Sequence, residues 1–279
     1  MYLLVSNHRR QTIPWFVNFV GASEILMRLS KDPWLGPLLS PKPMQVFYDL
    51  LSEAVEDRRA HGNTVGKPHF IDTFVNGKHA DGQPLIPNPV VAYGEAATAI
   101  TGGSDSTAWT LAAALSCVLR SPNVLKTLET EVLGAHREGK LSEPVVNWTK
   151  GASLDYVQAV LRETLRIYPM FTGRLTRESP PGGMNILGQW VPEGVELGNC
   201  LTVVQRDKEI FGEDADEFSP ERWLPLDGER AKEMERFIGT WGFGTRTCLG
   251  KSIAQMELTK GRSTCINSNG RSLVANIDA

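Results

Sequence analysis

Apolar residues recur every three or four positions along several stretches of the sequence, which is the spacing of an amphipathic helix. Residues 43–60 follow this spacing, and Gly62 offers a C-terminal stop. Residues 121–138 follow it with Ser121 as the N-cap, and residues 154–168 follow it up to a proline. The pattern therefore predicts three amphipathic helices, each with one apolar face.

The longest predicted helix covers residues 89–119 and would be about 46 Å long at the usual rise per residue. It is rich in Ala, Thr, Ser and Leu and carries few charges, so we expect it to be buried on most sides. Gly102 and Gly103 lie near its middle, at a cost of about 1 kcal/mol each relative to alanine. Two explanations remain open: close contact with another helix, or a flat ligand against the glycines, beside a local distortion that turns a hydroxyl toward it.

Short β-like pieces replace the helical spacing in residues 170–198, which are rich in Gly and Pro. Residues 185–187 and 189–191 are expected to pair as strands, and residues 192–194 to form a turn. Residues 213–236 are highly charged and are expected to lie on the outside of the molecule. The sequence thus predicts a mainly α fold with a small β-sheet.

Composition and charge narrow the possible functions only a little. The 279 residues are 41% apolar, enough for one large core, and the net charge of −3 gives no indication of nucleic-acid binding. The four cysteines are scattered without a Cys-x-x-Cys pair, which argues against structural zinc and suits a reducing compartment. Residues 1–42 carry aromatic patches that fit a core or an exposed patch, and their apolar run, residues 13–20, is too short to span a bilayer.

Residues 241–250 read Trp-Gly-Phe-Gly-Thr-Arg-Thr-Cys-Leu-Gly, and a helical run, residues 251–260, follows at once. Cys248 is therefore expected just before or within the first turn of a helix, where backbone N–H groups and the helix dipole favour a thiolate. The loop glycines let a large flat group approach the backbone, and Arg246 offers a charge for its carboxylates. These features indicate a cysteine-ligated haem iron, with a structural turn around a small apolar Cys248 as the alternative.

The order aromatic, Gly, any, Gly, any, Arg, any, Cys, any, Gly resembles the haem-binding loop of the cytochrome P-450 superfamily, with Trp241 in place of the usual phenylalanine. The resemblance implies haem b (iron protoporphyrin IX) with Cys248 as the axial ligand of the iron. Arg177, with Arg174 as a competitor, matches the position of a basic residue that meets a haem propionate. The other residues that the resemblance places at the cofactor are Arg246, Gly102, Gly103, Trp241, Phe243, Gly250 and Ala254.

Residues 102–107 resemble the oxygen-activation segment of the family's central helix. In this match Asp105 is the acid, Ser106 stands where threonine is usual, and Thr107 is the next hydroxyl. The resemblance implies that these three residues deliver protons during catalysis. Serine keeps the hydroxyl but lacks the methyl group that helps to fix its rotamer.

Glu163 and Arg166 share a helix face, and an isolated exposed pair of this kind would be worth only about 0.2–0.5 kcal/mol. The pair stands in the family's order, upstream of the cysteine loop, and residues 218–223 supply Arg222 as the usual third partner. The resemblance therefore implies a buried, purely structural ion-pair network of Glu163, Arg166 and Arg222. Residues 205–211 resemble a further family segment, with Gln205 and Lys208 replacing the commoner His and Pro.

The whole chain, residues 1–279, is interpreted as one partial cytochrome P-450 domain: a central long helix, an ion-pair helix, a meander, the cysteine loop and a following helix. The resemblance is clearest over residues 43–260, and residues 261–279 are expected to be an atypical tail. The front half of an intact member, including a membrane anchor, is expected to be missing. The members that the chain resembles most are fungal ones similar to pisatin demethylase.

The resemblance implies a haem-thiolate monooxygenase that inserts one oxygen atom of dioxygen into a small apolar organic substrate. Electrons would come from a separate NADPH-dependent reductase. The family is expected at the cytoplasmic face of the endoplasmic reticulum membrane, which this chain would reach only through the missing anchor or a peripheral patch. The alternatives are a truncated, non-catalytic remnant that binds haem poorly or not at all, and a helical scaffold that has no need of Cys248.

Overall fold

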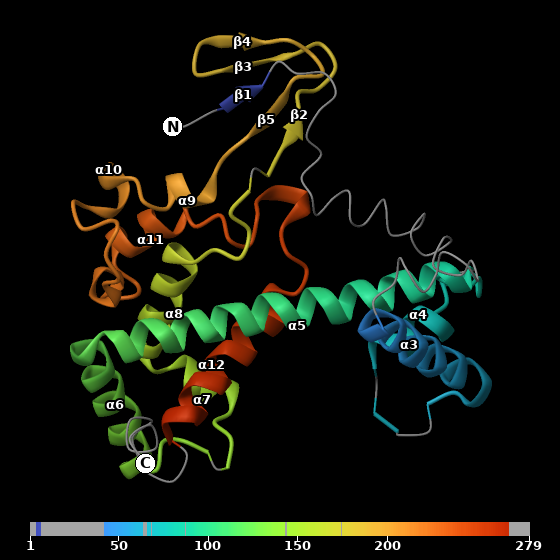
Figure 1. The fold of residues 1–279 in the computed structure, drawn as a ribbon, viewed down its shortest axis with the longest axis horizontal. Coiled ribbons are helices and arrows are strands. Elements are labelled where there is room, and N and C mark those ends of the chain that lie inside the picture. The colour runs from blue at the N-terminus through green and yellow to red at the C-terminus, as the bar shows by residue number, and fades with distance from the viewer. Residues whose placement is uncertain are drawn as a thin grey trace. The chain divides into compact units, whose positions relative to one another are not determined.

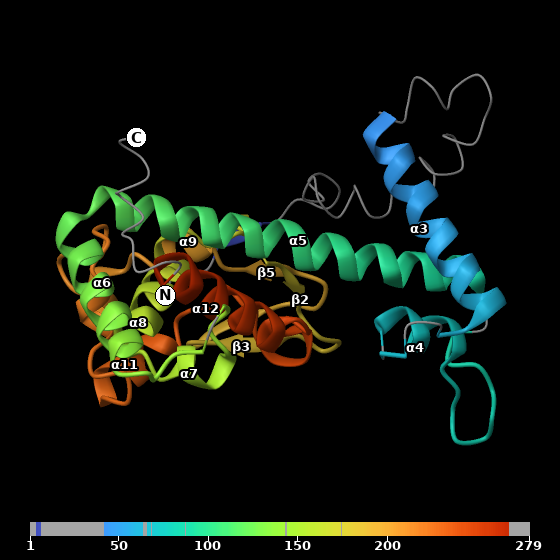
Figure 2. The same ribbon diagram turned by 90° about the horizontal axis from the view of Figure 1, so that it is seen from below.

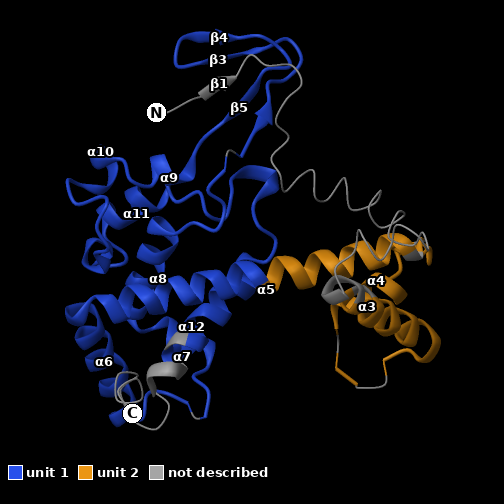
Figure 3. Cartoon of the chain, in the orientation of Figure 1, with its two compact units in different colours: residues 1–9, 105–279 blue, residues 10–104 orange. Residues whose placement is uncertain are grey.

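The computed structural model describes residues 4–6, 42–63, 66–67, 69–86, 88–142, 144–173 and 175–267 (Figure 1). The aromatic patches of residues 7–41, the candidate Arg174 and residues 268–279 lie outside the described residues. The chain divides into two compact units, residues 10–104 and residues 1–9 with 105–279 (Figure 3). Among the helices that the structure describes, none has the length and apolar character needed to cross a bilayer.

The described part of the unit of residues 10–104 is a small group of helices. Helix α3 (Lys42–His61) packs on α4 (Phe70–Asn76) and on the first part of α5 (Pro89–Arg120), around a core of Leu51, Val55 and Ala96. The predicted helix over residues 43–60 is confirmed, and Gly62 ends it with φ of 67° while its N–H donates to Arg58 O at 3.0 Å. The predicted apolar face is only partly covered, since Val46 and Leu50 are exposed.

Helix α5 has the predicted extent, but the expected burial on most sides is wrong. Val90, Ile100 and Trp109 are 64%, 42% and 50% exposed. An apolar helix is buried only where another element covers it, and in the described residues covered positions such as Ala92 and Ala114 are a minority along α5. The helix is also α-helical throughout, so the expected local distortion near Gly102 and Gly103 is not found.

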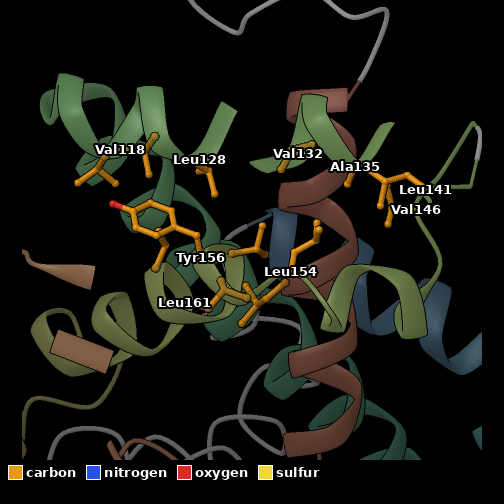
Figure 4. Close-up of a cluster of buried hydrophobic side chains, with 13 residues drawn as sticks. Val118, Leu128, Val132, Ala135, Leu141, Val146, Leu154, Tyr156 and Leu161 are labelled. Carbon is orange, nitrogen blue, oxygen red and sulfur yellow. The ribbon is translucent and has the colours of Figure 1, made fainter. Parts of the chain in front are cut away.

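The second unit is built around α12 (Lys251–Asn267), which packs against α6 (Pro122–Arg137), α7 (Trp148–Ala152) and α8 (Asp155–Ile167) (Figure 2). The predicted helices over residues 121–138 and 154–168 are confirmed as α6 and α8. Figure 4 shows their shared core, in which Leu128, Val132, Leu154, Tyr156 and Leu161 are labelled. Leu258 of α12 belongs to the same core.

The N-termini of α6 and α8 differ in how they are capped, and the side-chain cap predicted for α6 is not formed. Ser121 is at the N-cap position of α6, but its side chain makes no capping hydrogen bond. Helix α8 begins after Leu154, which has no capping side chain, and the carboxylate of Glu131 on α6 takes that role instead. Its two oxygens accept the N–H groups of Tyr156 and Val157 at 2.8 and 3.0 Å, which ties α6 to α8.

Two small antiparallel sheets complete this unit. Strand β5 (Glu196–Gly198) lies between β1 (Leu4–Ser6) and β2 (Arg177–Glu178). The predicted hairpin is confirmed as β3 (Met184–Ile186) with β4 (Gln189–Val191), in the register Ile186 to Gln189. Its two turn residues, Leu187 and Gly188, have φ of 50° and 82°, the left-handed conformation that suits a two-residue hairpin. The mainly α fold with small sheets is therefore confirmed.

The charged stretch over residues 213–236 lies mostly at the surface, as the sequence predicts, but a few of its apolar residues are buried. It contains the short helix η1 (Pro220–Trp223) and helix α11 (Glu229–Glu235), and it follows α9 (Leu201–Val204) and α10 (Lys208–Phe211). Trp223 and Met234 are 0% and 1% exposed and pack with Phe211 in a second core. Because most residues of the stretch are charged, its few buried apolar residues are hard to recognise in the sequence. Its charged groups lie at the surface or in ion pairs.

Candidate functional site

The cysteine loop, residues 241–250, connects α11 to α12 and includes the short helix η2 (Gly244–Arg246). The N–H of Cys248 donates to Trp241 O at 2.7 Å, which closes the loop on itself. Gly242 and Gly244 have φ of 72° and 66°, and a Cβ on Gly242 would lie 3.4 Å from Arg246 O. Both glycines are thus required by the backbone conformation of the loop.

The structure places Cys248 just before the first turn of α12. Lys251 N donates to Cys248 O at 3.4 Å, and Ala254 N donates to Gly250 O at 2.9 Å, so the regular helix starts directly after the cysteine. The Cys248 side chain is exposed and forms no disulfide. In the parts of the chain that are described, no three His, Cys, Asp or Glu side chains gather to hold a metal ion.

The donor set around Cys248 fits a haem group. A thiolate from one cysteine is an established axial ligand of haem iron, and Gly250, where an added Cβ would lie 4.0 Å from Cys248 Sγ, leaves out a side chain beside the sulfur. The other predicted cofactor residues of the loop and α12 lie within this segment, exposed or half-buried: Trp241, Phe243, Arg246, Gly250 and Ala254.

Arg177 is not brought to the loop by any described contact. It lies exposed on β2, and its Nη1 donates to the carbonyl of its neighbour Thr176 at 2.8 Å. The competing residue, Arg174, lies outside the described residues. The assignment of Arg177 to a haem propionate therefore stays a prediction.

The predicted residues on α5 belong to both compact units. Asp105, Ser106 and Thr107 lie in the unit that contains Cys248, whereas Gly102 and Gly103 lie in the other. A Cβ added at Gly102 or Gly103 would meet no described atom within 4 Å, so close contact with another described helix does not explain the two glycines. Asp105 is exposed, and Ser106 and Thr107 are half-buried.

Glu163 and Arg166 of α8 form one buried network with Arg222 of η1. The Glu163 carboxylate accepts Nε and Nη2 of Arg166 at 2.8 and 2.7 Å, and Nε of Arg222 at 3.0 Å. The same carboxylate accepts the N–H of Ser219 and the indole N–H of Trp223, both at 2.9 Å. Five donors thus converge on one carboxylate that is 0% exposed, which is how a buried charge is tolerated.

Arg166 is equally well satisfied, although it is also 0% exposed. Besides its two bonds to Glu163, Nη1 donates to the carbonyls of Gln205 and Ala215 at 2.7 and 2.5 Å, and Nη2 donates to Glu217 O at 2.9 Å. All of the guanidinium N–H groups are therefore used. The Phe211 ring lies 5.0 Å from its Cζ and adds a cation–π contact.

The sequence did not identify Asp214 and Trp223 as members of this network. Arg222 donates to both carboxylate oxygens of Asp214 at 3.0 and 2.9 Å, so two carboxylates balance two guanidinium groups. The hydrogen bond from Arg222 lowers the pKa of Asp214, and partial burial opposes this effect. Trp223 directly follows Arg222, and as a large aromatic residue in a charged stretch it could have been predicted to be buried. Nothing in the local sequence distinguishes Asp214 from its acidic neighbours.

A cavity of about 130 Å³ lies between α8, α12 and the end of α11. Trp241 and Lys251 line it beside the ion pair of Arg162 and Glu235, whose Nη2 and Oε2 are 3.5 Å apart. Of the residues that the sequence placed at a cofactor, only Trp241 lines this cavity. The cavity therefore adjoins the cysteine loop at Trp241.

Comparison with known proteins identifies the family. The family model described as cytochrome P-450 matches residues 31–267. The chain is similar to a cytochrome P-450 monooxygenase of Aspergillus terreus, with 34% identity over 248 residues that cover 83% of this chain and 50% of the relative. It is similar to one of Alternaria alternata, with 37% identity over 58% of this chain and 43% of the relative.

A cytochrome P-450 monooxygenase of Pyricularia oryzae is 33% identical over 83% of this chain and 46% of its own length. The chain thus spans about half the length of the curated relatives that it matches. The match covers the cysteine loop, the ion-pair network and α5, which are the features that the structure describes above. The chain belongs to the cytochrome P-450 family and is of the fungal type.

Proposed function

We propose that this chain holds haem b through the Cys248 thiolate and acts as a haem-thiolate monooxygenase. One observation carries the proposal: Cys248 is exposed at the start of α12 in a loop that is closed by its own N–H bond to Trp241. When bound, the haem iron supplies the activation of dioxygen, with electrons from a separate NADPH-dependent reductase, so that one oxygen atom enters a small apolar organic substrate.

The residues next to Cys248 bind and orient the cofactor in this proposal. Arg246 is exposed within the loop and pairs with a propionate, and Arg177 is the candidate for another. Gly250 lacks a side chain beside the sulfur. Gly102 and Gly103 on α5 are further candidates, on the family resemblance alone. The apolar contacts with the ring come from Trp241, Phe243 and Ala254.

The polar residues of α5 hold and move protons. Asp105 is exposed and offers a carboxylate to water, while Ser106 and Thr107 offer hydroxyls one and two positions later. Thr110 Oγ1 already donates to Ser106 O at 2.9 Å, as a helix-internal bond. The proton path in this proposal therefore begins at Asp105 and ends at a hydroxyl of Ser106 or Thr107.

The family expectation for the location is the cytoplasmic face of the endoplasmic reticulum membrane, and we propose the same for the whole protein. The relatives from Aspergillus terreus, Alternaria alternata and Pyricularia oryzae are named as monooxygenases, which supports this activity for those proteins. For this chain, a non-catalytic remnant and a helical scaffold are the alternatives that the experiment must separate.

The test is the carbon monoxide spectrum of the reduced chain, expressed with haem available. We expect the red-shifted Soret band of thiolate ligation in the wild type and its loss in Cys248→Ser. Cys200→Ser is the matched control, since Cys200 Sγ lies 3.0 Å from Thr202 Oγ1 in a contact that a serine hydroxyl can replace, and it is expected to keep the band.

Other results would favour the alternatives. A wild-type chain that takes up no haem, or a Cys248→Ser variant with an unchanged band, would contradict the proposal. Thiolate-type haem binding without product formation, in the presence of a reductase and a panel of small apolar substrates, would favour the remnant.

A further inference from the structure

Gln205 connects the end of α8 to the segment that enters the cysteine loop. Its side chain is 0% exposed. Its Nε2 donates to Leu165 O at 3.1 Å and to Arg166 O at 2.7 Å, which are carbonyls of the last turn of α8. Such carbonyls have no partner within the helix, so an amide that supplies two donors satisfies them.

The other end of the same amide accepts from the loop segment. Gln205 Oε1 accepts the N–H of Gly239 at 2.9 Å, and Thr240 Oγ1 lies 3.5 Å from it. Thr240 Oγ1 also donates to Leu165 O at 2.9 Å. The residues that directly precede Trp241 are therefore held against the C-terminus of α8 through one buried side chain.

The backbone of Gln205 is fixed independently of its side chain. Its carbonyl accepts Nη1 of Arg166 at 2.7 Å, and the next residue, Arg206, donates to Ile167 O at 2.7 Å. The ion-pair network thus determines where the Gln205 amide lies. From Gly239 the connection continues along the backbone, since Gly239 O accepts Gly242 N at 2.8 Å and Trp241 O accepts Cys248 N at 2.7 Å.

We infer that Gln205 is a positioning residue for Cys248. It transmits the rigid geometry of the ion-pair network to the cysteine loop and thereby sets the position of the sulfur relative to α8. The inference rests on the proposed role of Cys248 as haem ligand, but Gln205 itself touches neither cofactor nor substrate. A neutral amide suits this place because it donates to two carbonyls and accepts from an N–H group at once, which a carboxylate or a methyl-ended side chain cannot do.

Two variants separate the two halves of this connection. Gln205→Glu keeps the oxygen that accepts from Gly239 N–H but loses the two N–H donors. Gln205→Met fills similar space and loses the acceptor as well as the donors. The matched control is Thr164→Val on α8, which is also 0% exposed and loses only a helix-internal bond from Oγ1 to Val160 O.

The first measurement is hydrogen–deuterium exchange of residues 239–250 in the haem-free chain, compared under conditions of equal global stability. We expect Gln205→Met and Gln205→Glu each to speed exchange in this segment by roughly tenfold or more, the latter because its buried carboxylate would face two carbonyl oxygens without a donor, and Thr164→Val to leave it unchanged. Unchanged exchange in Gln205→Met, or an equal increase in Thr164→Val, would overturn the inference.

The second measurement is the fraction of thiolate-type haem in the carbon monoxide spectrum of the same variants. We expect this fraction to fall in Gln205→Met and to persist in Thr164→Val. A wild type without the thiolate band would count against the proposed function, while the exchange data would still decide whether Gln205 holds the loop. An unchanged thiolate fraction in Gln205→Met, with a normal wild type, would overturn the positioning role.

Discussion

Glu163 Oε1 accepts a hydrogen bond from Arg222 Nε at 3.0 Å, across a sequence separation of 59 residues. This bond fixes η1 to α8, and Trp223 reinforces it by donating to the other oxygen of the same carboxylate. The carboxylate is buried among partners that are all donors, so its charge is an organising feature of the fold rather than a group available for chemistry.

We expect Glu163→Gln to destabilise the chain by about 3–5 kcal/mol. The amide carries no charge to balance the buried guanidinium of Arg166, and its NH2 group would face N–H groups that need an acceptor. Urea unfolding followed by circular dichroism measures this loss. Glu229→Gln is the control, because Glu229 pairs with Lys232 at 3.0 Å while its side chain is 93% exposed, and we expect little change there. Similar losses in both variants would contradict a special role for the buried network.

We expect Gly103→Ala to stabilise the haem-free chain by about 0.5–1 kcal/mol and to weaken haem binding. The gain follows from helix propensity, since an added Cβ meets no described atom within 4 Å, and the loss follows from the proposed haem contact. Gly94→Ala is the matched control on the same helix, also with no described atom within 4 Å of the added Cβ. It is expected to give the same gain in thermal stability without affecting haem titration, and equal haem affinity in both variants would argue against Gly103 as a cofactor contact.

We expect Asp214→Asn to remove a pH-dependent part of the stability. The pKa of Asp214 is lowered in the folded chain, so its ionised form stabilises the fold at pH values above the ordinary aspartate pKa of about 3.9. This contribution is lost as the pH falls through the lowered folded value. The difference in urea midpoint between wild type and variant should therefore be constant near neutral pH and shrink in acid, and a difference independent of pH would refute the assignment.

We expect Gly239→Ala to destabilise the chain by about 1–3 kcal/mol through overpacking. An added Cβ would overlap Leu201 Cδ2 and lie 3.0 Å from Phe243 Cε2, and Leu201 is only 1% exposed and has little room to move. Gly134→Ala on α6, where the added Cβ meets no described atom within 4 Å, serves as the control and should not destabilise. A thermal melt of the two variants decides, since equal midpoints would mean that the contact at Gly239 is absent.

The sequence predicted those features that depend on neighbours along the chain. Helix α3, α5 and the β3–β4 hairpin have nearly the predicted limits, because glycine and proline stops and apolar periodicity act within a few residues. The position of Cys248 just before α12 was also predictable, since the glycine spacing and the following helical run are local.

The sequence by itself thus determined the family and most of the helices, and it predicted Cys248 as the haem ligand. Only the tertiary structure decided that Trp223 is buried and that Trp109 on α5 is half exposed. It also decided that Asp214 accepts from Arg222 and that the Gln205 carbonyl accepts from Arg166. Burial and hydrogen-bond partners depend on residues that are far apart in the sequence, and a polar residue such as Gln205 looks the same in a sequence whether it faces water or closes a buried network.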